Sequence, residues 1–169
     1  MTRRHAVVDT ELGRLTMVAD GSALTAVYFP HHWHLPPETE YGEPTAADDP
    51  VFVQAARELD EYVAGDRREF DVEIATSGDD FSERVWAMLR EIPYGETTTY
   101  GELARRLGNP RLAQRVGQCV GRNPISVIIP CHRVIGADGS LTGYAGGLDR
   151  KRRLLEIEEP PEVSDARLF

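Results

Sequence analysis

The chain has 169 residues, of which 41% are hydrophobic and 28% charged, and its formal net charge is −9 at pH 7. A chain of this length can bury a core without disulfides or a structural metal, and its composition is that of a globular protein rather than a disordered or membrane protein. No apolar run approaches the roughly 20 residues of a membrane-spanning helix, and the first residues lack the apolar stretch of a secretory signal. We therefore expect a cytoplasmic protein with no membrane partner, in which Cys119 and Cys131 are free thiols.

Charge is distributed unevenly along the chain. Residues 84–153 contain 12 basic and five acidic side chains, a balance of +7, whereas the remaining residues have a balance of −16. Phosphate attraction is screened within about 10 Å at ~0.1 M salt, so a basic half can bind nucleic acid although the whole chain is acidic. An unevenly charged solvated surface produces the same pattern. Charge alone leaves both interpretations open.

The first predicted domain, residues 1–78, consists of strands and turns with one helix. Four short runs rich in apolar and β-branched residues are separated by turn residues, which is the pattern of strands. These strands are predicted at residues 6–9, 15–19, 23–29 and 70–75. After a long polar loop, Asp49 and Pro50 predict the N-cap and first position of a helix that ends at Gly65. Residues 76–80 are polar and form the predicted linker.

The second predicted domain, residues 79–169, is mainly helical. One helix is expected at about residues 82–90. Thr99 with Glu102 three residues later forms a capping box that starts a second helix. Asn109, followed by a proline, starts a third. Together with the strands of the first domain, these helices predict an α+β fold.

Polar side chains form one stripe on the face of the third helix opposite its apolar residues. The stripe contains three arginines, two glutamines and no acidic residue: Arg111, Gln114, Arg115, Gln118 and Arg122. Two short helices joined by a glycine-containing turn, the second with such a face, are typical of a DNA-binding helix-turn-helix. A solvated helix of a helical bundle has the same pattern, so spacing alone leaves both interpretations open.

Cys131 is the candidate nucleophile. It follows an apolar run at residues 126–129, which predicts a buried strand, and it precedes His132 and Arg133. Cationic groups near a thiol favour the thiolate, which is the nucleophile. Adjacent side chains of an extended chain point to opposite sides, so we expect a water between His132 and the sulfur. An inert buried cysteine and a metal ligand stay open as alternatives.

Five segments of the second domain carry a resemblance to a known family. They are IPYGETTTYGELA at 92–104, VG at 116–117, NP at 123–124, IPCHRVIG at 129–136 and GYAGGLDRKRRLLEIE at 143–158. With these segments, residues 92–158 closely resemble the O6-alkylguanine-DNA alkyltransferases, or methylated-DNA–protein-cysteine methyltransferases. Weaker matches, VW at 85–86 and GDRREFDVE at 65–73, extend the likeness over most of the chain. The resemblance implies a ribonuclease-H-like N-terminal α/β domain and a C-terminal winged helix-turn-helix domain that presents the cysteine.

The resemblance implies DNA repair by direct reversal of damage, in which the alkyl group of O6-alkylguanine moves once and irreversibly to Cys131. It implies that His132 deprotonates Cys131 through a water and that Glu158 holds the histidine. It also implies that Asn123 ties the helix-turn-helix to the cysteine-bearing strand. Tyr100 is expected to donate a proton or hydrogen bond to the guanine as it leaves.

The resemblance also implies how the base and the DNA are bound. The backbone of Cys131 and of Val134 is expected to read the exocyclic amine, the N–H of Ala145 to reach O6, and Tyr144 to form a wall of the pocket. The expected partner is double-stranded DNA containing O6-alkylguanine, bound by a monomer without a cofactor or metal. Alkyl size, activity on O4-methylthymine and cooperativity on DNA stay open.

The chain departs from the family at one position of the third helix. The family has an arginine before an Ala-Val-Gly, and this arginine fills the gap left by the flipped base. Here Gln114 stands at that position, and Arg115 stands where the alanine would be. One residue rotates a side chain by about 100° around a helix. Either Gln114 is a shorter wedge, or a change at the helix start lets Arg115 fill the gap.

Two other functions compete with alkyl transfer. A damage sensor of this type flips the base without reacting, but such relatives lack the cysteine, so Cys131 argues against it. A thiol hydrolase or redox protein would turn over repeatedly, and it leaves the helix-turn-helix unexplained.

Three further groups are expected to have no catalytic role. The histidines of the long loop, His31, His32 and His34, are expected to be exposed rather than metal ligands, because no cysteine lies near them. Cys119 is expected in the core. Residues 150–153 are expected to form a solvated helix start or a phosphate contact.

Overall fold

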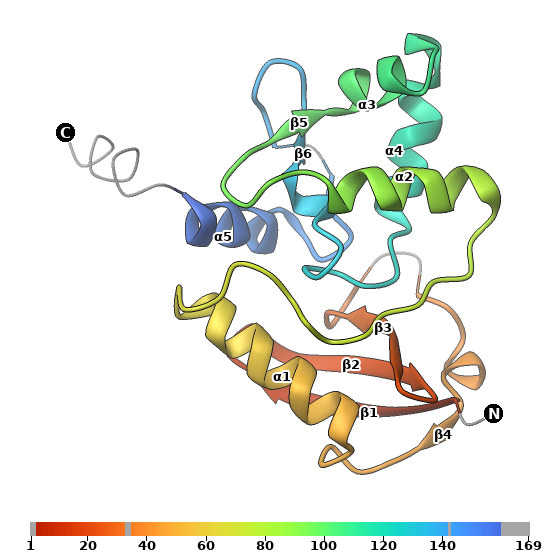
Figure 1. The fold of residues 1–169 in the computed structure, drawn as a ribbon, viewed down its shortest axis with the longest axis vertical. Helices are drawn as coiled ribbons and strands as arrows, with labels where there is room; N and C mark the ends of the chain where they lie inside the picture. Colours follow the sequence, from red (N-terminus) through yellow and green to blue (C-terminus); the bar gives the residue numbers. More distant parts are fainter. Residues whose placement is uncertain (1–2, 33–34, 142, 160–169) are drawn as a thin grey trace. The chain divides into compact units, whose positions relative to one another are not determined.

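The computed structural model describes residues 3–32, 35–141 and 143–159, which form two compact units (Figure 1). One unit contains Met1–Gly78 with Pro124–Ile128, and the other contains Asp79–Asn123 with Ile129–Phe169. The chain returns briefly to the first unit at residues 124–128, which the predicted single boundary after residue 78 does not include. That return is made by backbone hydrogen bonds, because the Val27 N–H donates to the Pro124 carbonyl at 2.8 Å.

The first unit is a four-stranded sheet with one helix on it. The strands lie in the order β3-β2-β1-β4 and are β1 (Arg3–Thr10), β2 (Gly13–Asp20), β3 (Ala23–Tyr28) and β4 (Glu43–Pro44). The first three pair antiparallel, and β4 pairs parallel with β1. The first three predicted strands are confirmed. The predicted long loop contains β4 and a 3₁₀ turn, η1 (Glu38–Tyr41).

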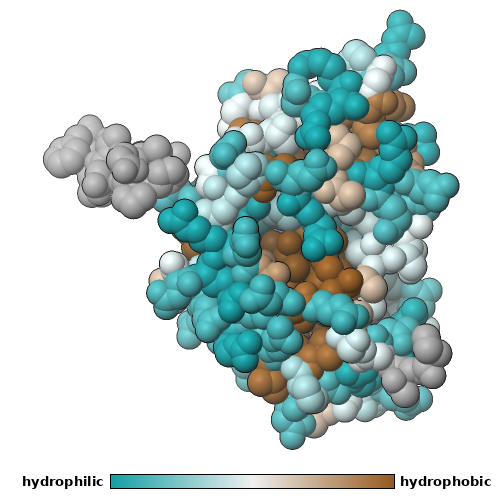
Figure 2. Space-filling view, in the orientation of Figure 1, coloured by the Kyte–Doolittle hydropathy of each residue, from teal (hydrophilic) through white to brown (hydrophobic). Residues whose placement is uncertain are grey.

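Helix α1 (Pro50–Val63) packs on this sheet. Its start is as predicted, because the Asp49 side chain accepts a hydrogen bond from the Val51 N–H at 3.1 Å. Phe52, Leu59 and Tyr62 are fully buried, and Figure 2 shows hydrophilic residues over its outward side. This division into an apolar and a polar face is what a surface helix requires.

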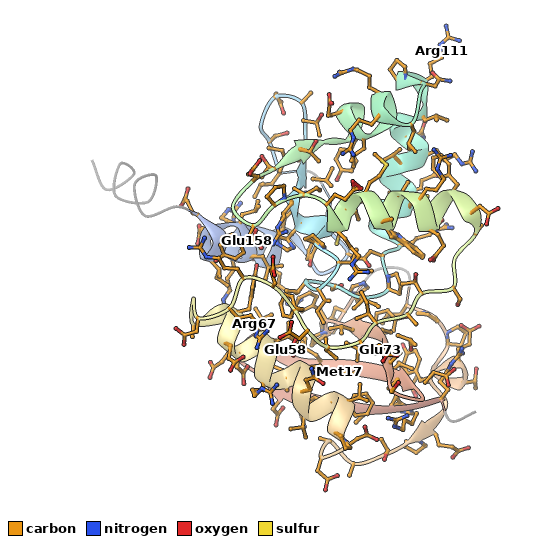
Figure 3. The ribbon with its side chains drawn as sticks, viewed as in Figure 1. Met17, Glu58, Arg67, Glu73, Arg111 and Glu158 are labelled. Carbon is orange, nitrogen blue, oxygen red and sulfur yellow. The ribbon has the colours of Figure 1, made fainter. Side chains whose placement is uncertain are left out.

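The predicted strand at 70–75 is wrong. Only an isolated bridge between Leu24 and Ile74 forms there. The buried Glu58 of α1, labelled in Figure 3, accepts hydrogen bonds from the Asp71 N–H at 2.8 Å and from the Val72 N–H at 3.1 Å. Those two amides therefore bond a carboxylate, and the segment pairs with β3 at residues 73–75, where the Leu24 N–H donates to the Glu73 carbonyl at 2.8 Å and the Ala75 N–H donates to the Leu24 carbonyl at 3.1 Å.

The second unit contains four α-helices and a two-stranded parallel sheet among its described residues. The helices are α2 (Asp80–Arg90), α3 (Tyr100–Arg106), α4 (Ala113–Gly121) and α5 (Leu148–Glu158). The 3₁₀ turns η2 (Pro110–Leu112) and η3 (Cys131–Arg133) and the strands β5 (Thr98–Thr99) and β6 (Val134–Ile135) complete it. None of the helices in the described ranges combines the length and hydropathy of a membrane span.

The predicted strand at 126–129 is also wrong, although its residues are buried as expected. Val127 has a φ of 72°, a value that a strand does not allow and that a β-branched residue rarely adopts. The Ile128 N–H donates to the Ser126 carbonyl at 2.8 Å, so the chain turns at this point. Cys131 therefore follows a buried turn and not a strand.

Candidate functional site

Cys131 begins the 3₁₀ turn η3 and is 5% exposed. The turn corrects the expected extended geometry, because the Arg133 N–H donates to the Pro130 carbonyl at 3.1 Å. In a 3₁₀ turn, consecutive side chains diverge by about a third of a turn rather than alternating between two sides. The expected water between His132 and the sulfur stays a prediction.

His132 and Glu158 form a buried pair, as the resemblance implies. The His132 Nε2 lies 2.6 Å from the Glu158 Oε2, and both side chains are almost completely buried. Glu158 comes from the last turn of α5, where Figure 3 labels it. Burial lowers the pKa of His132, and the nearby charges of Arg133 and Lys151 act in the same direction, while Glu158 opposes them. The ring is therefore neutral at pH 7 and able to accept a proton.

The cation that acts on the sulfur is Lys151. Burial raises the pKa of Cys131, whereas hydrogen bonding by Asn123 and Tyr144 and the charge of Lys151 lower it. Arg133, which the sequence analysis placed in this role, instead directs its guanidinium to Glu158, 2.7 Å from the carboxylate.

Lys151 belongs to residues 150–153, which were expected to form a solvated helix start or a phosphate contact, and it is a site residue that the basic composition of this segment did not indicate. Its side chain is fully buried, and burial lowers the pKa of Lys151 to about 8. A signal was present, because Lys151, Leu154 and Glu158 are spaced i, i+3, i+7 and share the inward face of α5. The periodicity of the helix was therefore more informative than its basic composition.

Asn123 and the small sheet position the elements around Cys131. The Asn123 Nδ2 donates to the Ile129 carbonyl at 2.8 Å, which ties the end of α4 to the segment that leads to Cys131. Thr98 pairs with Val134 between β5 and β6, so α3 starts close to η3. Tyr100, the first residue of α3, lies with its ring against Gly117 of α4, where an added Cβ would be 3.7 Å away.

The three residues expected to line the base pocket are all buried. Val134 is 0%, Tyr144 4% and Ala145 6% exposed. Interaction with Tyr144 lowers the pKa of the Cys131 thiol, so Tyr144 lies close to Cys131.

The predicted polar stripe is exposed along its whole length. Its members are Arg111, Gln114, Arg115, Gln118 and Arg122, and Figure 3 shows Arg111 projecting away from the helix pair. The Arg115 guanidinium lies over the ring of Phe81 in α2, 3.9 Å from its centroid, a cation–π contact. Arg115 thus contacts Phe81 of α2, although its side chain, like that of Gln114, is exposed.

The remaining candidates lie outside this site. Cys119 is buried in α4, as expected, and its Sγ lies 3.4 Å from the Ser82 hydroxyl. His32 corrects the expectation of exposed histidines, because it is buried and its Nδ1 accepts from the Phe29 N–H at 3.3 Å. His31 is exposed, and His34 lies outside the described residues. Within the described ranges, no three His, Cys, Asp or Glu side chains are grouped to hold a metal.

Two family models match the chain, one to each unit. The model described as 6-O-methylguanine DNA methyltransferase, DNA binding domain, matches residues 80–160, and the model of the ribonuclease-like domain matches residues 4–76. The chain belongs to the 6-O-methylguanine DNA methyltransferase family. The predicted family and the predicted two-domain α+β fold are confirmed.

Relatives and solved structures of this methyltransferase family match the chain over nearly its full length. A methylated-DNA–protein-cysteine methyltransferase of Mycobacterium tuberculosis is 45% identical over 165 residues, 98% of each chain. One of Methanosarcina acetivorans is 43% identical over 154 residues, 91% of this chain and 97% of the relative. The crystal structure of the Mycobacterium tuberculosis O6-methylguanine methyltransferase has a TM-score of 0.81 at 42% identity, covering 98% of this chain and 99% of that one. The Mycobacterium tuberculosis OGT in complex with DNA has a TM-score of 0.83 at 47% identity, covering 92% of each chain.

Proposed function

We propose that this protein repairs DNA by transferring the alkyl group of O6-alkylguanine to the Sγ of Cys131. The observation that carries the proposal is the buried His132–Glu158 pair, with Nε2 and Oε2 2.6 Å apart, directly after a buried cysteine in a chain of this family. Such an arrangement supplies a nucleophile, a proton acceptor and a group that orients the acceptor. The thiol chemistry requires a reducing compartment, so we place the protein in the cytoplasm.

The reaction exchanges one bond for another. The Cys131 thiol loses its proton through a water to His132, and Glu158 stabilises the cationic imidazole. The sulfur then attacks the alkyl carbon in line, the S–C bond forms, and the C–O6 bond breaks. Tyr100 donates a proton or hydrogen bond to the departing guanine. The thioether has no leaving group that would restore the thiol, so each molecule reacts once.

The base is bound outside the DNA stack. A base inside a duplex cannot reach a buried sulfur, so the nucleotide is flipped at a cost of a few kcal/mol. The backbone of Cys131 and Val134 reads the exocyclic amine, the Ala145 N–H reaches O6, and Tyr144 stacks as a wall of the pocket. These contacts identify the guanine rather than its alkyl group.

The exposed stripe of α4 binds double-stranded DNA, and one protein molecule acts alone on each lesion. Arg111, Gln118 and Arg122 contact the duplex, with arginines neutralising phosphates. Gln114 fills the gap left by the flipped base, because Arg115 is already engaged with Phe81 at 3.9 Å. Gln114 is therefore a short wedge in place of the arginine of the family.

A direct test uses a duplex with a single O6-methylguanine and peptide masses after mixing. We expect a methyl group on the Cys131 peptide, in an amount that never exceeds the moles of protein. Lesion binding without modification would support a damage sensor instead. Release of many products per protein molecule would support a hydrolase or redox enzyme.

Gln114→Ala and Arg115→Ala are expected to have different effects on the affinity for DNA and on the stability of the fold. Gln114→Ala lowers the affinity for the methylated duplex by about tenfold, because a lost contact at one base pair costs roughly 1–3 kcal/mol. Arg115→Ala removes the contact with Phe81 and costs about 0.5–1 kcal/mol of stability, with a smaller effect on affinity. Titration of the labelled duplex and thermal melts measure the two quantities. A larger loss of affinity in Arg115→Ala would assign the wedge to Arg115.

Lys151→Met is expected to slow transfer and to stabilise the fold. Without the ammonium, the pKa of Cys131 rises and the thiolate fraction falls, so the transfer rate at pH 7 drops by about tenfold. In the folded state the pKa of Lys151 is about 8 instead of 10.5, so below pH 8 its burial costs stability, and this cost fades as the pH rises above 8. The variant should gain roughly 1–3 kcal/mol at pH 7.

Lys151→Met is compared with Arg152→Met, a substitution of an exposed cation on the same helix. Single-turnover rates and denaturant melts at pH 7 and about pH 10 measure both effects. An unchanged transfer rate in Lys151→Met would remove Lys151 from the chemistry.

A further inference from the structure

Arg133 is buried and makes three hydrogen bonds within the second unit. Its Nε donates to the Glu158 Oε1 at 2.7 Å, and its Nη2 donates to the Glu158 Oε2 at 3.0 Å. Its Nη1 donates to the Ile92 carbonyl at 2.7 Å. The side chain is 8% exposed, and the carboxylate it binds is 2% exposed. A two-pronged contact of this kind fixes the plane of a carboxylate, which a single hydrogen bond does not.

The Glu158 carboxylate is shared between Arg133 and His132. Its Oε2 accepts from the Arg133 Nη2 and lies 2.6 Å from the His132 Nε2. Its Oε1 accepts from the Arg133 Nε and, at 3.4 Å, from the Gly95 N–H. Rotation of the carboxylate would break both Arg133 bonds together, so the guanidinium determines where Oε2 lies and therefore how the His132 ring is turned.

We propose that Arg133 is a positioning residue for alkyl transfer, which fixes the Glu158 carboxylate and, through it, the orientation of the His132 ring. This inference rests on the proposed function. It gives Arg133 a different role from a cation that stabilises the thiolate, since Lys151 is the cation that acts on Cys131. Arg133 acts on the proton acceptor and not on the nucleophile.

The charge of Arg133 also affects the proton acceptor. Three charged groups act on His132: Glu158 and Lys151 from α5, and Arg133 from η3. Glu158 raises the pKa of His132, and the two cations lower it. Tyr94 lies with its ring 5.7 Å from the Arg133 guanidinium. Loss of the Arg133 charge therefore raises the pKa of His132. The ring then stays protonated up to a higher pH, and a protonated ring cannot accept a proton from Cys131.

Two substitutions separate geometry from charge. Arg133→Lys keeps the charge and loses the two-pronged contact, so the transfer rate constant should fall by about a hundredfold with little change in the position of the acidic limb of the pH profile. Arg133→Gln loses the charge as well, so the acidic limb should also move to higher pH by about one unit. Both are measured on the O6-methylguanine duplex between about pH 4 and 9, in single turnover, so that the acidic limb set by the lowered pKa of His132 lies within the range.

Single-turnover kinetics distinguish this role from a purely structural one. The amplitude reports the fraction of folded, reactive protein, and the rate constant reports the chemistry of that fraction. The matched control is Arg4→Lys, because Arg4 makes a similar two-pronged contact with Asp49 in the first unit, at 2.5 and 3.0 Å. The control should lower the thermal midpoint and leave the rate constant unchanged. If Arg133→Lys lowers only the midpoint and the amplitude, Arg133 is a structural residue and the proposal is wrong.

A double-mutant cycle with Glu158→Gln tests the route of the effect. If Arg133 acts through Glu158, Arg133→Lys should slow transfer in the wild-type background and have little further effect in the Glu158→Gln background. If the rate reductions of the two substitutions instead multiplied in the double variant, Arg133 would act by another route and the proposal would be wrong. Absence of methyl transfer in the wild-type protein would instead refute the proposed function, so the two failures are distinguishable.

Discussion

Cys131→Ser is expected to abolish methyl transfer and to leave binding to the methylated duplex measurable. The serine hydroxyl has nearly the same shape as the thiol, so the buried turn η3 should keep its structure. A hydroxyl does not ionise at neutral pH in the way that a thiol does, and alkyl transfer needs the ionised nucleophile. We expect the transfer rate to fall by at least roughly a thousandfold, in line with other nucleophile substitutions, with lesion affinity within about tenfold of wild type.

Cys119→Ser is the matched control, because Cys119 is the other thiol of the chain and is also buried. It should transfer the methyl group with the rate and the stoichiometry of the wild-type protein. Peptide masses and fluorescence titration of the same duplex measure transfer and binding. Equal loss of binding and transfer in Cys131→Ser would mean that Cys131 has a structural role and is not the acceptor.

Glu158→Gln is expected to have the second largest effect, on both stability and rate. The substitution removes the charge that compensates Arg133, which donates to both carboxylate oxygens at 2.7 and 3.0 Å. Breaking a buried pair in this way costs about 3–5 kcal/mol. The amide also offers an N–H where His132 needs an acceptor, so the ring loses its orientation, and the transfer rate should fall by about 10²–10⁴.

The pH dependence of Glu158→Gln follows from the direction of the pKa shift. Glu158 raises the pKa of His132, so its loss lowers that pKa further, and the acidic limb of the rate profile should move to lower pH while the plateau drops. Glu156→Gln, an exposed position of α5, is the control and should match wild type in both properties. Urea melts and single-turnover rates measure the effects. A wild-type rate in Glu158→Gln would show that the histidine does not depend on this carboxylate.

The helix starts could be predicted from the sequence because their hydrogen bonds are local. The Thr99 hydroxyl accepts from the Glu102 N–H at 3.1 Å at the start of α3, and the Asn109 side chain accepts from the Arg111 N–H at 2.9 Å at the start of the 3₁₀ turn η2, after which α4 begins at Ala113. Each bond joins residues two or three positions apart, so the residue types alone indicate it. The exposed stripe of α4 was predictable for the same reason, since helical periodicity relates nearby positions.

Two predicted strands failed because strand-like composition does not determine which groups the backbone amides bond. Residues 70–75 have strand-forming composition, but the carboxylate of Glu58 takes two of their amides. Residues 126–129 are apolar and buried, but Val127 adopts a φ of 72° and the chain turns. An apolar run indicates burial, whereas a strand also requires a neighbouring strand that leaves its amides and carbonyls available.

The residue pattern by itself determined the family, the two-domain organisation, the helix caps and the candidate nucleophile Cys131, because each depends on a motif or on neighbours along the chain. Only the tertiary structure decided that Lys151 is buried and acts on the thiol, that Arg133 binds Glu158 and not the sulfur, and that Arg115 rests on Phe81. The physical reason is that the stability of a charge depends on its burial and its partners. In this site the two side chains that bind Glu158, Arg133 and His132, are 25 and 26 residues away along the chain, a distance over which composition and spacing carry no information about contact.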